Sequence, residues 1–539
     1  MDHDSSAELD SIPPIHASSG TRSKPDGLMG DFVRLKEAVL QKRPVLREII
    51  DRWGKKTLID YAKDYFSVNL NPPILSRQNE LISTIHEMVT EQCGAELADI
   101  ASRQLQKYYF VNTADHVGPI THPWALNTSL LIAAPCMAHQ DPDLRAVITL
   151  ACSNVSLNNA SFPRGLTFHS SMNGNVKLHR LSFLPSNSHA SAAYGFRPYT
   201  MVDIEKLRKL LRQLKRDHEI AGREEVIIQD ILTEIYSPAD VLGATTYPEQ
   251  MIRTNHRIWR KYFPDDKKQH PDLVYLEQET VVIRLLKKFH LWSDTTINHL
   301  LFDPAYDPLV HQYFNGVLSA FDTKEQRGTY LFWGVSKDRN YRVQLWKQGG
   351  ELVSTDGSVR IRLTPESLQE ALDRREIVPS IMLIFAVLSF YYGLKCLGGF
   401  NQVNYLTFMK NAYIKMQVDR GNYKSIEVCA RAQTKETVDG VFAFLETVDK
   451  RLMQATGLDL ILYGDDERWN HLLAELQTMT VEDALNPGMA DFYRFMYVGA
   501  EADPTLLNVT SDQISEVTGQ AHRIRPFIRI HDYPLPTPV

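Results

Sequence analysis

The residues best suited to chemistry lie in one short loop, residues 113–123, whose sequence is TADHVGPITHP. An imidazole titrates near neutral pH, so His116 and His122 are candidate general acids or bases, and either could neutralise phosphate charge during phosphoryl transfer. The carboxylate of Asp115 could bind Mg²⁺ or orient His116. Structural alternatives remain open, because a histidine can cap the helix that follows and an Asp can close a turn. The loop also supplies two candidate ligand-binding residues, Thr113 and Gly118.

Two further stretches carry polar groups that could bind a ligand. The first, residues 153–169, supplies Asn158, Asn159, Arg164 and His169. Arg is a bidentate partner of phosphate or carboxylate and Asn amides bind uncharged groups, although adjacent Asn residues can equally serve only as turn formers. The second stretch, residues 398–405, supplies Gly398, Gly399, Asn401, Asn404 and Tyr405. Its glycines allow a ligand or another segment to approach the backbone closely, and we expect this stretch to lie beside residues 113–122.

Metal binding and nucleic-acid binding find little support in the sequence. Three histidines, His116, His122 and His169, could share a metal ion, but no H-x-x-x-H spacing or carboxylate pairing accompanies them, so no metal site is predicted. The five cysteines lack CxxC spacing, which is typical of a reducing compartment. A net charge of -6 gives no electrostatic reason to expect nucleic-acid binding. The polar N-terminus shows no signal peptide, so we expect a cytoplasmic protein that acts on small molecules.

The first two polar stretches each follow a predicted strand. Tyr108–Asn112 is an aromatic and β-branched run, and Ala146–Cys152 (AVITLAC) is a second apolar run. Between them, Trp124–Ala134 lacks Gly and Pro and is predicted to be a helix, with Pro123 suited to its first turn. The pattern predicts a βαβ unit of neighbouring parallel strands. Both loops would then lie beyond the carboxyl ends of the strands, where ligands bind in such sheets.

The rest of the chain is expected to surround this unit with helices. We predict a disordered segment at 1–28, a helical lead-in at 29–104, the first half of the core at 105–200, a helical insertion at 201–328, a small antiparallel β-meander with the second half of the core at 329–420, and a mostly helical region at 421–539.

Four shorter segments need separate interpretation. Asp272–Leu286 fits a strand or a helix equally well. Asn173-Gly174 predicts the turn of a hairpin, and LDLILYG, at 458–464, looks like a strand. The apolar run Ile377–Phe390 contains Pro379 and falls short of the roughly 20 residues that a membrane-spanning helix needs. It is therefore predicted to be a buried core helix.

Two separate segments resemble the bacillithiol-biosynthesis cysteine-adding enzymes. In that family a strand runs into a Gly/Gln-rich turn, a Thr-Gly-Pro step and a long helix, and YYFVNTADHVGPITHPWALNTSLLIA has the same order, with Thr121-His122-Pro123 at the step. The family's next strand leads to an acidic, histidine-containing loop, and VITLACSNVSLNNASF stands in that place. Further on, a buried helix leads to GGFNQVNY, in which Gly398, Gly399 and Tyr405 match the family's Gly-Pro-Gly-Glu-Ile-Tyr-type turn by residue type.

The resemblance implies an α/β fold with a Rossmann-like core, binding of ATP or ADP, and amide ligation of an amino acid to an amine. The nucleotide would sit across residues 112–123 and 153–169, with residues 398–405 closing the cleft. The chain departs from the family, because Ser and Asn residues replace the acidic loop and Asp115-His116 replaces the Gln-rich turn. We therefore expect a biosynthetic ligase-like enzyme with altered substrate or chemistry. The alternative is a catalytically silent nucleotide-binding relative that serves as a sensor or assembly factor, and a homo-oligomer is one option for either.

Overall fold

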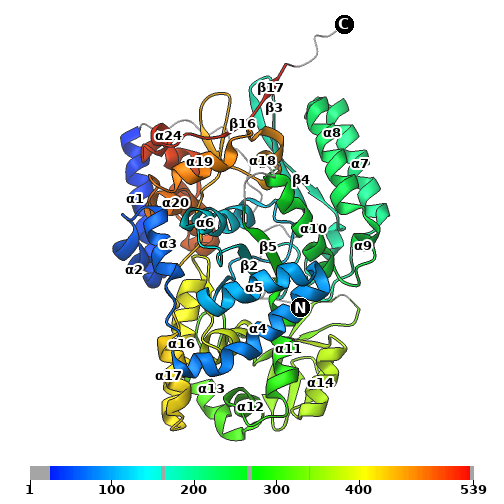
Figure 1. The fold of residues 1–539 in the computed structure, drawn as a ribbon, viewed down its shortest axis with the longest axis vertical. Helices are drawn as coiled ribbons and strands as arrows, with labels where there is room; N and C mark the ends of the chain where they lie inside the picture. Colours follow the sequence, from blue (N-terminus) through cyan, green and yellow to red (C-terminus); the bar gives the residue numbers. More distant parts are fainter. Residues whose placement is uncertain (1–24, 160–163, 264–269, 339, 535–539) are drawn as a thin grey trace.

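A parallel four-stranded sheet lies at the centre of the molecule (Figure 1). Its strands, in spatial order, are β13 (Lys395–Leu397), β1 (Phe110–Asn112), β2 (Ala146–Ala151) and β5 (Asp272–Glu277). The computed structural model describes residues 25–159, 164–263, 270–338 and 340–534. β1 and β2 are parallel neighbours, with Asn112 opposite Thr149, and α6 (Pro123–His139) crosses between them. The predicted βαβ unit is confirmed.

β5 comes from the segment whose secondary structure the sequence left undecided. The strand ends at Glu277, and α11 (Gln278–Leu285) begins at the next residue, so the segment is a strand and then a helix. Because β5 is buried on both faces, its apolar run shows neither a two-residue nor a 3.6-residue period. The region 201–328, predicted to be a helical insertion, thus also supplies a strand of the central sheet.

The order of the strands reverses between β1 and β13. From β1 the chain adds β2 and then β5 on one side, and it later returns to place β13 on the other side of β1. Helices cover both faces: α6 and α10 (Tyr247–Tyr262) pack on one, and α4 (Pro72–Cys93), α5 (Ala95–Tyr108) and α11 lie on the other. Alternate strand residues accordingly enter two separate cores, as Phe110, Val147 and Leu273 do in one and Val111, Ile148 and Val274 in the other.

The N-terminal helices divide between the sheet and the C-terminal region. Of the segment 1–28 predicted to be disordered, residues 1–24 lie outside the described residues. The prediction is wrong for residues 25–28, which form the start of α1 (Pro25–Lys42). It is followed by α2 (Pro44–Trp53) and α3 (Leu58–Phe66). These three helices contact elements from the last hundred residues or α6, whereas α4 and α5 contact the sheet (Figure 1).

In its described residues, the connection from β2 to β5 contains a hairpin and four α-helices. β3 (Gly165–Met172) and β4 (Asn175–Ser182) are antiparallel, and Asn173 and Gly174 turn between them with φ of 51° and 77°. Both φ values are positive, as the predicted two-residue turn requires. The helices are α7 (Met201–Arg216), α8 (Gly222–Ile231), α9 (Ala239–Leu242) and α10. After α11 come α12 (Thr296–Phe302) and α13 (Asp307–Phe314).

The predicted β-meander is confirmed. It consists of β8 (Phe332–Val335), β9 (Arg342–Gln348), β10 (Glu351–Ser354) and β11 (Arg360–Arg362), and after α14 (Pro365–Asp373) it gains β12 (Ile377–Pro379). The helix predicted over Ile377–Phe390 begins only at Ile381, as α15 (Ile381–Phe385) and a π-helical turn, Ala386–Tyr391. The prediction is wrong for Ile377–Pro379, which pairs with β8 as β12. Within the described residues, no helix combines the length and apolar character needed to cross a membrane.

The C-terminal region is mostly helical, with one correction to the sequence interpretation. It contains α16 (Gln402–Asp419), α17 (Tyr423–Arg431), β14 (Phe444–Glu446), β15 (Leu452–Gln454), α18 (Gly457–Tyr463), α19 (Arg468–Glu475), α20 (Val481–Leu485), α21 (Met489–Met496), α22 (Pro504–Leu507), α23 (Ser511–Val517), α24 (Gln520–Arg523), β16 (Ile528–Arg529) and β17 (Asp532–Tyr533). The strand-like segment LDLILYG forms α18, so that prediction is wrong. A capping box explains the helix, because Thr456 and Asp459 each bind the other's backbone N–H.

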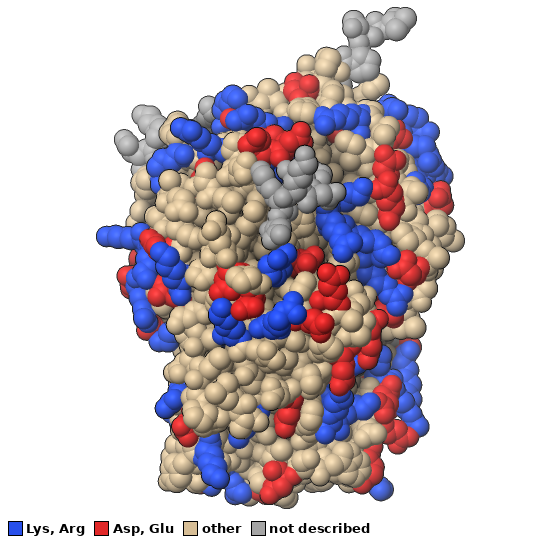
Figure 2. All heavy atoms as spheres, in the orientation of Figure 1, with Lys and Arg blue, Asp and Glu red and all other residues tan. Residues whose placement is uncertain are grey.

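Positively and negatively charged side chains are not segregated into separate patches on the face seen in Figure 2. Lys and Arg lie interspersed with Asp and Glu across it. Such a surface creates no extended field of one sign there, in line with the small net charge of the chain.

Candidate functional site

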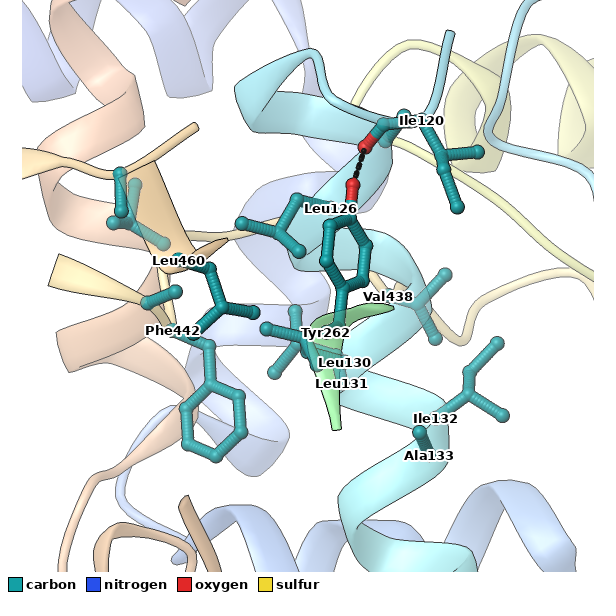
Figure 3. Packing of buried hydrophobic residues seen from close by; sticks show 14 of the residues in the cluster. Ile120, Leu126, Leu130, Leu131, Ile132, Ala133, Tyr262, Val438, Phe442 and Leu460 are labelled. Carbon is teal, nitrogen blue, oxygen red and sulfur yellow. Dashed lines mark hydrogen bonds between the residues drawn. The ribbon is translucent and has the colours of Figure 1, made fainter. Parts of the chain in front are cut away.

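Buried polar side chains hold the loop that follows β1. Asn255, on α10, donates to the carbonyl of Gly118 at 2.8 Å and accepts from the N–H of Ile120 at 3.1 Å. The hydroxyl of Tyr262 donates to the Ile120 carbonyl at 3.0 Å (Figure 3), and that of Tyr275 donates to the His116 carbonyl at 3.1 Å. The loop backbone is therefore fixed by neutral donors, which keeps its side chains in defined positions.

Asp115 is the most unusual group in this loop. It is only 3% exposed, and its Oδ1 accepts from the hydroxyl of Thr128, on α6, at 2.7 Å. Its other oxygen, Oδ2, has no hydrogen-bond partner among the described residues. Burial raises the pKa of Asp115 to about 7, the Thr128 hydrogen bond opposes the rise, and the nearby charge of Asp439 adds to it. Near neutral pH this carboxyl group can therefore either give or take a proton.

The side chain of His116, in the loop after β1, contacts the loop after β2. The two loops therefore lie together, as predicted. Its Nδ1 lies 2.7 Å from Oδ1 of Asn159, and residue 116 forms a parallel bridge with Cys152. Because Oδ1 can only accept, Nδ1 carries the proton in this contact. The contact thus fixes the orientation of the half-buried imidazole.

The stretch 398–405 lies beside the loop after β1, as predicted. The side-chain amide of Gln402 donates to the hydroxyl of Thr113 at 2.6 Å, and that hydroxyl contacts the Leu397 carbonyl at 3.1 Å. Gly399 lies between the loops: a Cβ there would be 3.1 Å from Oδ2 of Asp439 and 4.0 Å from the Cβ of Ala114. A side chain here would crowd Asp439, so a glycine allows the close approach of the loops at the point where the strand order reverses.

Asp439 is a second acid at this edge, and no sequence pattern indicated it. Its Oδ2 accepts from the N–H of Phe400 at 2.9 Å and its Oδ1 from the N–H of Gly440 at 3.0 Å. Burial raises its pKa, although these two backbone hydrogen bonds oppose the rise. A cavity of about 10 Å³, lined in part by Tyr61, Leu131 and Asp439, adjoins it and has room for about one water molecule.

Glu279, on the first turn of α11, holds the turn after β2. This carboxylate is fully buried and accepts from the N–H groups of Ser153 and Asn154 at 2.8 and 2.9 Å, and from the Ser153 hydroxyl at 2.9 Å. The thiol of Cys152 donates to it at 3.2 Å. Burial and the charge of Glu277 raise its pKa, while the two backbone hydrogen bonds oppose them. Sequence reasoning missed Glu279 because the boundary between β5 and α11 was undecided.

Two of the candidate histidines have structural partners. His122 is the N-cap of α6, where its Nδ1 accepts from the N–H of Trp124 at 3.3 Å. This is the capping alternative foreseen for the loop. His169, on β3, lies 2.7 Å from Oδ2 of Asp459 through its Nδ1 and is buried against α18. The contacts with Trp124 and Asp459 do not bring His122 or His169 to His116. They therefore do not support a common site formed by the three histidines.

Of the predicted site residues near α16, some lie at the edge of the sheet and others contact the N-terminal helices. Asn401 accepts from Nε of Arg43 at 2.7 Å, and Asn404 accepts from the N–H of Val45 at 2.9 Å, so both hold the start of α2. Tyr405 packs against Phe385, and its buried phenol is close enough to Cys152 for their charges to interact. Gly398 and Gly399 thus belong to the edge of the sheet, whereas Asn401 and Asn404 face the helices.

Unpartnered polar atoms gather at the carboxyl edge of the sheet. Among the described residues, Oδ2 of Asp115, Oδ1 of Asn154 and Nε2 of Gln278 have no hydrogen-bond partner, and they follow β1, β2 and β5 respectively. All three side chains are at most 3% exposed. Burying such an atom without a partner costs about 1–3 kcal/mol, so native proteins retain few of them without a ligand, a water molecule or a function.

No protein-family model matches the chain, and no curated protein matches it in sequence. The chemistry of the edge is therefore inferred from its geometry. Among the described residues, no three His, Cys, Asp or Glu side chains are grouped so that they could hold a metal ion. A Mg²⁺ ion held here would have the carboxylate of Asp115 as a protein ligand and would need further oxygen ligands from a bound substrate.

Proposed function

We propose that this chain is an ATP-dependent ligase-like enzyme with a Rossmann-like core, which joins an amino acid or a small amine to a small-molecule acceptor. The reversal of strand order between β1 and β13 carries the proposal, because parallel sheets with helices on both faces bind ligands at such a point. The unpartnered Asp115 oxygen and the close approach of Gly399 to Asp439 lie at this point. The resemblance to the bacillithiol cysteine-adding enzymes supports the nucleotide and the ligation.

Each loop has a distinct task in this proposal. ATP or ADP binds across the loops after β1 and β2, and ATP supplies the activated phosphate or adenylate that amide formation needs. His116 acts as the base for the attacking amine, with its imidazole oriented by Asn159. Asp115 binds Mg²⁺ or exchanges a proton, for which a pKa of about 7 is suitable. The five cysteines are unpaired, and we place the enzyme in the cytoplasm.

One observation favours a second candidate, a catalytically silent nucleotide-binding sensor or assembly factor. The backbone N–H groups of Ser153 and Asn154, at the end of β2, already bind the carboxylate of Glu279. In an active site such donors would often face the substrate instead. ATP turnover separates the candidates, because both would bind nucleotide and only the enzyme would release phosphate or AMP when amino acids are added.

Replacing His116 with Gln tests the enzyme proposal. The change removes the titrating group with little change in volume, so ATP turnover should fall by about 10²-fold or more. The affinity for ATP should change less, since a group used in the transition state affects rate more than binding. Phosphate and AMP release in the presence of an amino-acid mixture, together with calorimetric titration of ATP, provide the two readouts.

His122→Gln is the matched control for that experiment. Loss of the α6 cap should lower the free energy of unfolding by about 1 kcal/mol and leave turnover nearly unchanged. A His116→Gln protein that retains full turnover would remove His116 from the proposed chemistry. Nucleotide binding without turnover in the wild type would favour the silent candidate.

A further inference from the structure

The cavity next to Asp439 is enclosed by segments that are far apart in the chain. Its walls come from α3, α6, α20 and residues 437–439, and its volume of about 10 Å³ has room for about one water molecule. Leu131 and Val438, which line two of the walls, are labelled in Figure 3. Apart from Thr437 and Asp439, the lining side chains are aliphatic or aromatic. Among the described residues that line the cavity, Asp439 alone can carry a charge.

The hydroxyl groups on the walls already donate to backbone carbonyls. The hydroxyl of Tyr61 donates to the Thr437 carbonyl at 3.0 Å, and that of Tyr65 donates to the Leu131 carbonyl at 2.8 Å. The Thr437 hydroxyl donates to the Gly398 carbonyl at 2.9 Å, and the Thr437 N–H donates to the Tyr61 hydroxyl at 2.8 Å. A molecule in the cavity would therefore have to supply the hydrogen-bond donors itself.

The carboxylate of Asp439 has acceptor capacity left for such a molecule. Oδ2 accepts from the N–H of Phe400 and Oδ1 from the N–H of Gly440, whereas an ionised carboxylate offers about four acceptor positions. The two N–H groups hold the carboxylate in place beside the apolar walls. A carboxylate enclosed in this way is costly unless a positive charge pairs with it. The cavity is thus matched by a small cation that donates hydrogen bonds.

We propose that this cavity binds an ammonium ion, which makes ammonia the amine that the enzyme joins to its acceptor. An ammonium ion is close to a water molecule in size, can donate to Asp439, and would be enclosed by the rings of Tyr61 and Tyr65, since aromatic rings attract cations. A potassium ion needs several oxygen ligands to replace its hydration shell, and these mostly apolar walls do not offer them. The role of ammonia as substrate rests on the proposed function, whereas ammonium binding can be tested without nucleotide.

The cavity adjoins the proposed reacting edge of the sheet. A Cβ on Gly399 would lie 3.1 Å from Oδ2 of Asp439 and 4.0 Å from the Cβ of Ala114, in the loop after β1. In the reaction, ammonium gives one proton to Asp439, and the lone pair of the resulting ammonia attacks the ATP-activated carboxyl carbon of the acceptor. The C–N bond forms, the second proton passes to His116, and phosphate or AMP leaves with the electron pair of the broken C–O bond.

The test is thermal denaturation at pH 7 without nucleotide, with ammonium, methylammonium or potassium chloride as the probe. Choline chloride keeps the ionic strength constant, because its cation is too large for the cavity. Ammonium should raise the melting temperature of the wild type with a saturable dependence at millimolar concentration. Methylammonium has one heavy atom too many for the volume and potassium lacks hydrogen-bond donors, so both should need at least about tenfold higher concentrations. In Asp439→Asn the apparent dissociation constant for ammonium should increase at least about tenfold.

Asp64→Asn is the matched control. Asp64 lies on α3, as Tyr61 and Tyr65 do, but its carboxylate pairs with Lys56 at 2.5 Å and does not line the cavity. This variant should keep the wild-type response to ammonium. If Asp439→Asn does not fold, the comparison of the three cations in the wild type decides alone.

Three results would overturn the inference. They are the absence of a saturable ammonium response in the wild type, which would mean that the cavity holds only water, an equal response to potassium, and an unchanged response in Asp439→Asn. ATP turnover that amino acids support and ammonium does not would also overturn ammonia as the amine. A saturable ammonium response without any ATP turnover would leave the binding site standing and contradict only the ligase proposal.

Discussion

Replacing Asp115 with Asn is expected to stabilise the folded protein above pH 7 while abolishing most of its turnover. The wild-type carboxyl group has a folded-state pKa of about 7 against an ordinary value of 3.8. Asn resembles the protonated acid in shape and can still accept from Thr128, but it has no proton to lose. The substitution therefore removes the free-energy cost of ionising a buried carboxyl group.

The pH dependence follows from the raised pKa. Between about pH 4 and pH 7 the folded protein holds a proton that the unfolded chain has released, so the stability contributed by this group is full below 3.8 and is lost as the pH rises through about 7. Each pKa unit corresponds to about 1.4 kcal/mol, which makes the total on the order of 4 kcal/mol. Asp115→Asn should match the wild type near pH 4 and exceed it by a few kcal/mol at pH 8.

Urea denaturation at several pH values measures this difference, and ATP turnover measures the functional cost. We expect turnover to fall by about 10²-fold or more, the usual scale for a lost acid, base or metal contact. A variant that is more stable yet inactive would identify Asp115 as a group kept for function at the expense of stability. Wild-type and variant stabilities that differ equally at pH 4 and pH 8 would contradict the raised pKa.

Replacing Glu279 with Ala is expected to destabilise the protein by about 3–5 kcal/mol. The carboxylate binds two backbone N–H groups, the Ser153 hydroxyl and the Cys152 thiol, and all of these donors are buried. Removing one partner of a buried charged interaction leaves the others unsatisfied, at a cost of this size. The turn after β2 would also lose its anchor, which should weaken the contact between Asn159 and His116.

Glu91→Ala supplies the control for Glu279→Ala. Glu91, on α4, pairs with Arg284 of α11, the helix that also carries Glu279. The Glu91 side chain is about half exposed, so its loss should cost no more than about 1 kcal/mol. Guanidinium denaturation followed by circular dichroism gives both values, provided that the slope of the transition stays constant. A loss below 1 kcal/mol in Glu279→Ala would mean that water replaces the carboxylate and that the turn is open to solvent.

Local sequence patterns were sufficient to predict the elements that form the edge of the site. The strands β1 and β2 are short apolar runs that end in polar residues, and the Asn173-Gly174 pair has the turn chemistry that a hairpin needs. The approach of residues 398–405 to the loop after β1 could be predicted because both stretches adjoin buried elements and carry more polarity than a connection needs. Each of these predictions rests on patterns of neighbouring residues, although the last one concerns a contact across 289 positions.

The partners of those residues could not be predicted in the same way. Asn255 reaches Gly118 across 137 positions and Glu279 reaches Ser153 across 126, and no local pattern indicates which distant side chain will satisfy a loop. Asn401 and Asn404 look like loop ligands in sequence, yet α16 begins at Gln402 and directs them to α2. LDLILYG has a strand-like composition, and the capping box of Thr456 and Asp459 makes it a helix.

Calorimetric titration of Mg-ATP into the wild type and Gly399→Val tests most directly whether the edge between β1 and β13 binds a nucleotide. The backbone at Gly399 does not have a positive φ, so backbone strain does not exclude a side chain, and the Cβ of valine would stand 3.1 Å from Oδ2 of Asp439, where the carboxylate must shift to admit it. Gly30→Val is the control, because a Cβ on that exposed helix position contacts nothing within 4 Å. We predict one ATP per wild-type chain with a Kd between about 1 μM and 1 mM, unchanged in Gly30→Val and at least tenfold weaker in Gly399→Val. Absence of binding to the wild type, or equal affinity in Gly399→Val, would contradict the proposed site.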